Sequence, residues 1–98
     1  ASETVFISVF DESCQAASSQ AAARLRAAGF RVVAYPGAEK LAKQLKYADR
    51  LGARAALVIG PDEIARSEVV VKDLLARSQR VVPAAELEKQ IAAMLAER

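Results

Sequence analysis

Three almost purely apolar runs, separated by two segments with helical spacing, constrain this chain more than any other feature. The runs are Thr4 to Phe10, Phe30 to Tyr35 and Ala55 to Ile59. Continuous apolar runs rich in β-branched residues are typical of strands that are buried on both faces of a sheet. Tandem strand–helix–strand units favour parallel pairing with right-handed crossovers. The sequence therefore predicts three parallel strands with helices on both sides of the sheet.

The two intervening segments are predicted to be helices. The first runs from about Cys14 to Ala28, follows the capping residue Asp11 and stops at Gly29. The second lies between Glu39 and Arg54. Its apolar stripe has helical spacing and consists of Leu41, Leu45, Ala48 and Leu51.

The pattern changes after Gly60-Pro61. After this turn only the short segment Asp62 to Ser67 precedes the run Glu68 to Leu74, whereas a parallel return needs about a dozen residues. The fourth strand is therefore predicted to be antiparallel, with a hairpin to a fifth strand at Gln79 to Val82 and a last helix from Pro83. The prediction for residues 1–98 is a single three-layer α/β/α domain with a five-stranded mixed sheet and three main helices.

Composition excludes several kinds of chemistry. The chain has no histidine and one cysteine, so Ser–His–Asp triads, Cys–His pairs, intramolecular disulfides and imidazole-based zinc sites are ruled out. A lone cysteine fits a reducing compartment, and no apolar run approaches the roughly 20 residues of a membrane span. We expect a cytoplasmic domain without membrane contact, catalytic residues, cofactor or metal of its own.

Two short features resemble known sites only in part. Asp11-Glu12 follows the first strand like the acidic pair of a phospho-receiver domain, but Gly60 stands where such a domain needs an aspartate. Helix capping explains these acids. Cys14 opens a helix, which could activate a thiol, but it has no second cysteine or phosphate loop nearby. It is interpreted as an ordinary small residue.

The second predicted helix is markedly basic. Between Tyr35 and Arg54, five cationic and two anionic residues give a local charge of +3, against +2 for the whole chain. The cations are Lys40, Lys43, Lys46, Arg50 and Arg54. Two interpretations stay open: an ordinary solvated helix face, or a surface that binds a polyanion through its phosphates.

Two more charged residues have similar alternatives. Glu63 lies in the turn that begins at Gly60, as either a first-turn acid of a short helix or a hydrogen-bond acceptor for exposed base edges. Lys72 interrupts the apolar run Val69 to Val71. It is either an outward residue of a half-exposed strand or part of a site beside the Glu63 turn.

Four segments in order resemble the C-terminal anticodon-binding domain of class IIa aminoacyl-tRNA synthetases. They are Leu25 to Val32, Lys40 to Arg54, Val58 to Glu63 and Val70 to Leu74. The form Lys-x-x-Lys-Gln-x-x-x-Ala-Asp-x-x-Gly-Ala, followed by Val-Lys-Asp-Leu, is most similar to histidyl-tRNA synthetases. The resemblance covers the chain from Thr4 to about Leu95.

This resemblance implies a domain that holds the anticodon loop of a tRNA. A separate N-terminal catalytic domain, which would use ATP and Mg²⁺ to attach histidine, is expected outside these residues, so the chain is interpreted as an excised fragment. The fragment is expected to be monomeric and the parent a homodimer. RNA-binding residues implied by the family are Tyr35, Glu39, Lys40, Lys43, Gln44, Glu63 and Lys72. The alternative is a regulatory or protein-interaction module with the same fold.

Overall fold

The computed structural model describes residues 3–97 as five strands, four helices and two 3-10 turns. The strands are β1 (Thr4–Ile7), β2 (Arg31–Ala34), β3 (Ala55–Val58), β4 (Glu68–Asp73) and β5 (Ser78–Pro83). The helices are α1 (Gln15–Ala27), α2 (Leu41–Leu51), α3 (Pro61–Arg66) and α4 (Leu87–Ala96), and the 3-10 turns are η1 (Glu12–Cys14) and η2 (Ala84–Glu86).

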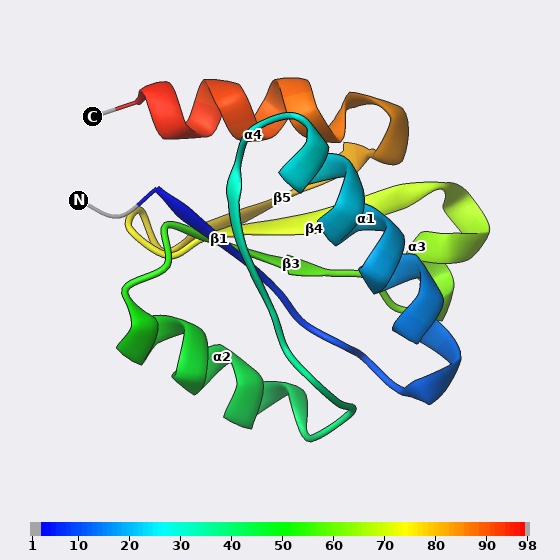
Figure 1. The fold of residues 1–98 in the computed structure, drawn as a ribbon. Helices are drawn as coiled ribbons and strands as arrows, with labels where there is room; N and C mark the ends of the chain where they lie inside the picture. The colour runs from blue at the N-terminus through cyan, green and yellow to red at the C-terminus, as the bar shows by residue number, and fades with distance from the viewer. Residues whose placement is uncertain (1–2, 98) are drawn as a thin grey trace.

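The strands form one mixed sheet in the order β2-β1-β3-β4-β5 (Figure 1). β1 pairs in parallel with both β2 and β3, whereas β4 runs antiparallel to β3 and to β5. The predicted α/β fold, including the antiparallel fourth strand, is confirmed. β4 runs antiparallel to β3 because α3 is too short to carry the chain back across the sheet.

Two predicted boundaries are wrong. The first strand ends at Ile7 and not at Phe10, since the amide of Val9 leaves the sheet and donates to the side chain of Gln44 at 2.8 Å. Pro83 does not begin the last helix; it is the final residue of β5, paired with Glu68. β5 is an edge strand, where a residue without an N–H is tolerated.

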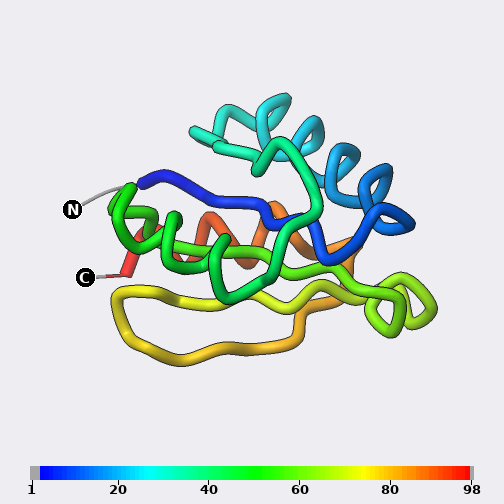
Figure 2. Tube along the Cα trace, turned by 90° about the horizontal axis from the view of Figure 1, so that it is seen from below, coloured from blue at the N-terminus to red at the C-terminus, as the bar shows by residue number. Residues whose placement is uncertain are grey.

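Helices cover the two faces of the sheet unequally. α1 and α4 pack on one face over the larger core, which includes Ile7, Leu25, Leu57 and Ile91. The other face carries a smaller core around Phe6, to which α2 contributes Ala48 and Leu45. Seen from below, α2 lies over β1 and β3, while none of the described helices covers this face of β4 and β5 (Figure 2).

This uncovered half of the sheet is a surface that we call the open sheet face. Alternation along β4 directs Val69 and Val71 into the larger core, so Val70 and Lys72 point to the α2 side. Their partners on β5, Val81 and Gln79, share that side. The open sheet face comprises Val70, Lys72, Gln79 and Val81. With 57 % of its surface exposed, Val81 is more accessible than a strand valine usually is.

Candidate nucleic-acid interface

One glutamine in the first turn of α2 forms hydrogen bonds to the backbone just after β1. Gln44 is completely buried; its Oε1 accepts from Val9 N, and its Nε2 donates to Val9 O and to Glu39 O, each at 2.8 Å. All three hydrogen bonds satisfy backbone groups that no strand partner pairs. The expectation that Gln44 contacts RNA directly is therefore corrected: its amide is inaccessible and it positions the residues around it.

Three exposed or half-exposed side chains form a network at the start of α2. Glu39 accepts a short hydrogen bond from the Tyr35 hydroxyl and another, at 2.6 Å, from Lys43 Nζ. The hydrogen bond from Lys43, followed by that from Tyr35, lowers the pKa of Glu39. The same contacts raise the pKa of Tyr35 and of Lys43. Glu39 thus stays ionised at neutral pH and offsets the charge of Lys43.

One of the five cations counted in the basic segment does not contribute to its exposed surface. Arg54 lies beyond the end of α2, is 8 % exposed and pairs with Asp73 at 3.4 Å. Asp49 pairs with Arg77 on the β4–β5 hairpin at 3.2 Å. Within this basic segment, three exposed cations have no ion-pair partner among residues 3–97, namely Lys40, Lys46 and Arg50. A positive surface therefore remains after all ion pairs are formed.

Glu63 closes the turn between β3 and α3. Its Oε1 accepts from Gly60 N at 2.7 Å, so its role as a first-turn acid is real. A Cβ at residue 60 would lie 2.9 Å from that oxygen and 3.3 Å from two ring atoms of Phe10. A side chain at residue 60 would therefore require the Glu63 carboxylate and the Phe10 ring to shift. Oε2 accepts no hydrogen bond from the described part of the chain and is available to a ligand.

Lys72 and Glu63 lie at different places on the sheet relative to α2. Lys72 lies opposite Ala56 of the α2-side core and donates to Gln79 Oε1 at 2.6 Å. Gly60, which Glu63 caps, lies four residues beyond Ala56, or about 13 Å along a strand. Lys72 is therefore on the α2 side of the sheet, whereas Glu63 lies at the carboxyl end of the sheet, so the two residues do not form a single cluster.

Phe10 is a surface residue, which its sequence pattern does not predict. The apolar run from Thr4 predicted burial, yet Phe10 is 45 % exposed beside the Glu63 turn. The signal that could have identified it is its position, immediately before the capping residue Asp11, where a strand must end. It is an accessible aromatic ring at the carboxyl end of the sheet.

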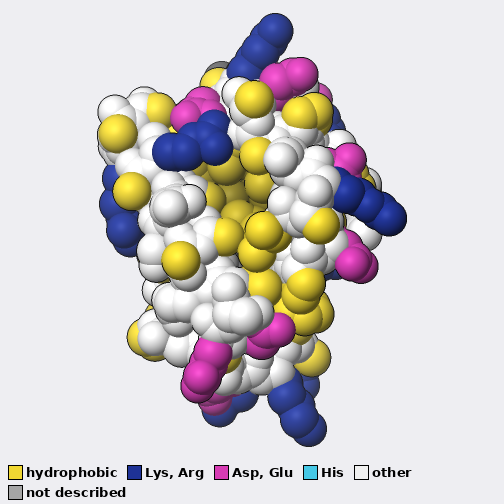
Figure 3. Space-filling view, turned by 90° about the vertical axis from the view of Figure 1, so that its right-hand side faces the viewer, with side chains coloured by type: hydrophobic (Ala, Val, Ile, Leu, Met, Phe, Trp, Pro, Cys, Tyr) yellow, Lys and Arg dark blue, Asp and Glu magenta, His cyan; other side chains and the backbone are white. Residues whose placement is uncertain are grey.

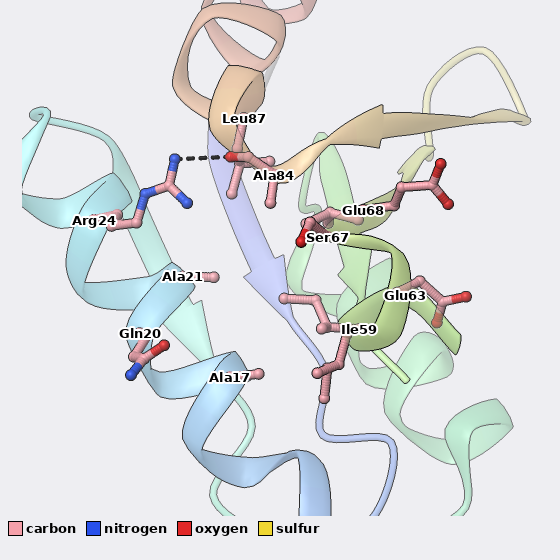
Figure 4. A pocket seen from close by; sticks show the side chains of 12 residues that line it. Ala17, Gln20, Ala21, Arg24, Ile59, Glu63, Ser67, Glu68, Ala84 and Leu87 are labelled. Carbon is pink, nitrogen blue, oxygen red and sulfur yellow. Dashed lines mark hydrogen bonds between the residues drawn. The ribbon is translucent and has the colours of Figure 1, made fainter. Parts of the chain in front are cut away.

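A separate apolar hollow lies on the α1 and α4 side of the sheet. Hydrophobic side chains gather in it (Figure 3), and its volume is about 180 Å³. Ala21, Ile59 and Leu87 point into it, while the Glu63 carboxylate points away (Figure 4). Arg24 borders it and donates to Ala84 O at 2.8 Å. Of the predicted site residues, only Glu63 borders this hollow, so the candidate interface belongs to the α2 side.

Other kinds of site find little support within residues 3–97. No group of three or more Cys, Asp or Glu side chains there could hold a metal ion. Burial raises the pKa of the Cys14 thiol, which favours the protonated, less nucleophilic form. None of the described helices is long and apolar enough to cross a membrane.

Comparison with known proteins gives consistent matches. The family model described as "Anticodon binding domain" matches residues 4–94. The histidine–tRNA ligase of Paracoccus denitrificans is 46 % identical over 72 residues, which are 72 % of this chain and 15 % of the relative. That of Caulobacter vibrioides is 40 % identical over 70 residues, 71 % of this chain and 14 % of the relative. The chain therefore spans only about a seventh of the length of these relatives.

Solved structures share the fold over nearly the whole chain. The histidyl-tRNA synthetase from Nostoc sp. PCC 7120 superposes with a TM-score of 0.89 at 30 % identity, covering 93 % of this chain and 22 % of that one. The RNA binding domain of the threonyl-tRNA synthetase from Cryptosporidium parvum Iowa II gives 0.82 at 19 % identity, covering 94 % and 23 %. The second likeness concerns the fold alone.

Proposed function

Because the chain belongs to the anticodon binding domain family, we propose that it binds the anticodon loop of a histidine tRNA as the C-terminal domain of a histidine–tRNA ligase. The observation that carries this proposal is the exposed positive surface at the start of α2, which adjoins an uncovered half of the sheet. Single-stranded loops are recognised by such combinations of cations and accessible base-binding surfaces.

The predicted residues take different parts in this proposal. Lys40, Lys43 and Lys72 would contact phosphates, because each is accessible and cationic. The free oxygen of Glu63 would accept a hydrogen bond from a base amino group. Tyr35 and Glu39 would hold the loop before α2 and orient Lys43.

The remaining activity is assigned to parts of the protein outside this chain. We propose that a separate catalytic domain attaches histidine to the tRNA with ATP and Mg²⁺, that the parent is a cytoplasmic homodimer, and that residues 1–98 form one monomeric anticodon-binding domain. The relatives' names support the ligase assignment. They do not favour the alternative of a regulatory or protein-interaction module.

Titration of the ¹⁵N-labelled chain with a histidine tRNA anticodon stem-loop tests this function. We expect amide shifts at the start of α2, in the Gly60 to Glu63 turn and on the open sheet face. Helix α4, on the other side of the sheet, provides an internal control and its amides should not shift. Shifts centred on α4, or none at low salt, would contradict the proposal.

A further inference from the structure

The three phenylalanines of the chain have different environments. Phe6 is completely buried beneath α2, and Phe30 packs partly buried against the larger core. Phe10 is 45 % exposed and lies where the chain leaves β1 for η1. Packing within the domain therefore uses only part of the Phe10 ring, and the rest is available for contact with a ligand.

The ring of Phe10 is held by its surroundings. It lies against Gly60, where the absence of a Cβ gives it room, and on the same side as Glu63 Oε1. The preceding residue, Val9, is fixed because its N–H donates to Gln44 Oε1 and its carbonyl accepts from Gln44 Nε2. A ring that is already ordered loses little conformational entropy on binding, so its contact contributes more to affinity.

The polar neighbours of Phe10 suit a nucleotide. Glu63 lies on one side, with Oε2 available as an acceptor. On the other side, the Gln44 amide donates to the carbonyls of Val9 and Glu39, and these residues directly precede Phe10 and Lys40. An aromatic ring and a hydrogen-bond acceptor therefore lie together at the carboxyl end of the sheet, and the backbone before Lys40 is hydrogen-bonded to the same Gln44 amide as the backbone before Phe10.

We propose that Phe10 is a stacking platform for one unpaired base of the bound RNA loop. This inference deepens the proposed function and rests on it. The exposed side of the ring stacks on the base, while Glu63 accepts a hydrogen bond from an edge of that base or its neighbour. Because every base has a π-face, Phe10 contributes to affinity for many loop sequences, whereas Glu63 distinguishes between them.

The test compares Phe10→Leu with Phe10→Tyr by measuring the Kd for the anticodon stem-loop. Leucine keeps an apolar contact with Gly60 but removes the aromatic face, whereas tyrosine keeps it. Phe10→Leu should weaken binding about 5- to 150-fold, the usual range for losing one base–aromatic stack. Phe10→Tyr should bind within about twofold of the unchanged chain, given that its ring can stack equally well. Thermal unfolding of both variants checks that each is folded.

A second measurement reports the contact directly. In a complex prepared with ¹³C-labelled phenylalanine, NOEs should join the Phe10 ring protons to protons of one base, and they should disappear in Phe10→Leu. Replacing that base by an abasic nucleotide should remove the difference in Kd between Phe10→Leu and the unchanged chain. If the unchanged chain binds with salt dependence but Phe10→Leu binds equally well, stacking is refuted while RNA binding stands. Failure of the unchanged chain to bind would instead refute the proposed function.

Discussion

Gln44 and Val9 exchange two hydrogen bonds of 2.8 Å between the first helical turn of α2 and the end of β1. These two hydrogen bonds pair the backbone of Val9, which follows β1 and has no strand partner of its own among the described residues. A third hydrogen bond from the same amide, to Glu39 O, fixes the residue before Lys40. The positions of Phe10 and Lys40 thus depend on one buried side chain that cannot itself contact a ligand.

Replacing Gln44 should therefore destabilise the domain. In Gln44→Leu the buried amide and carbonyl of Val9 lose their partners, and we expect a loss of about 2–4 kcal/mol in the free energy of unfolding. Urea denaturation measures this loss. Gln20→Leu, at an exposed position of α1, is the control and should change stability by no more than about 0.5 kcal/mol. Equal free energies of unfolding for Gln44→Leu and the unchanged chain would show that the amide and carbonyl of Val9 find other hydrogen-bond partners.

The ion pair between Arg54 and Asp73 should be important for stability because both side chains are buried. Asp73→Ala leaves the Arg54 charge poorly compensated and is expected to cost about 3–5 kcal/mol. The exposed pair between Asp49 and Arg77 provides the control, for which Asp49→Ala should cost about 1 kcal/mol or less. Similar losses in the two variants, measured by urea denaturation, would contradict the importance of burial.

Asp73 should also make stability depend on pH. Although burial raises the pKa of this carboxyl, hydrogen bonds from Ala76 N and Arg54 outweigh it and the pKa is lowered. A lowered folded-state pKa contributes stability that is present above the unfolded value of about 3.9 and is lost as the pH falls through the folded value. Asp73→Asn should remove this part of the acid dependence. Thermal melts of the unchanged chain and of Asp73→Asn between about pH 5 and 2 measure this acid dependence. Parallel curves of melting temperature against pH for the two proteins would refute the role of Asp73.

Glu63 has a capping role and a proposed recognition role that two substitutions can separate. Glu63→Gln keeps an oxygen for Gly60 N but removes the charge, whereas Glu63→Ala removes both. We expect Glu63→Ala to cost about 1 kcal/mol of stability and Glu63→Gln much less. Both should weaken the cognate stem-loop by about 1–3 kcal/mol more than a scrambled loop. Equal losses for the two loops would show that Glu63 only caps the helix.

Lys43 and Glu39 should have opposite effects on RNA binding. Lys43→Ala removes a cation and leaves the Glu39 carboxylate without its ion-pair partner, so all RNAs should bind more weakly. Glu39→Gln should strengthen binding because it releases the charge of Lys43. Lys89→Ala, on the far side of the sheet, is the control and should not change the salt dependence. Binding curves at several salt concentrations distinguish these outcomes, and a weakened Glu39→Gln would contradict the phosphate role of Lys43.

The sequence predicts the fold well because its main signals are local. Apolar runs and the short connection after Gly60 determine the strands and their directions, and these hold in the structure. The candidate site was harder to predict. Helical spacing placed Gln44 among exposed cations, but the groups that bury it belong to Val9, 35 residues earlier in the chain. The ion pair of Arg54 with Asp73 is likewise a tertiary contact, which no local pattern contains.

The most direct test of RNA recognition is the equilibrium affinity of this chain for a histidine tRNA anticodon stem-loop between about 50 and 200 mM salt. With phosphate contacts from Lys40, Lys43 and Lys72, log Kobs should fall against log salt with a slope of about −2, at about −0.7 per contact for single-stranded RNA. The cognate loop should bind more tightly than a scrambled one throughout. Undetectable binding at the lowest salt, or equal and salt-independent affinity for both loops, would contradict the account.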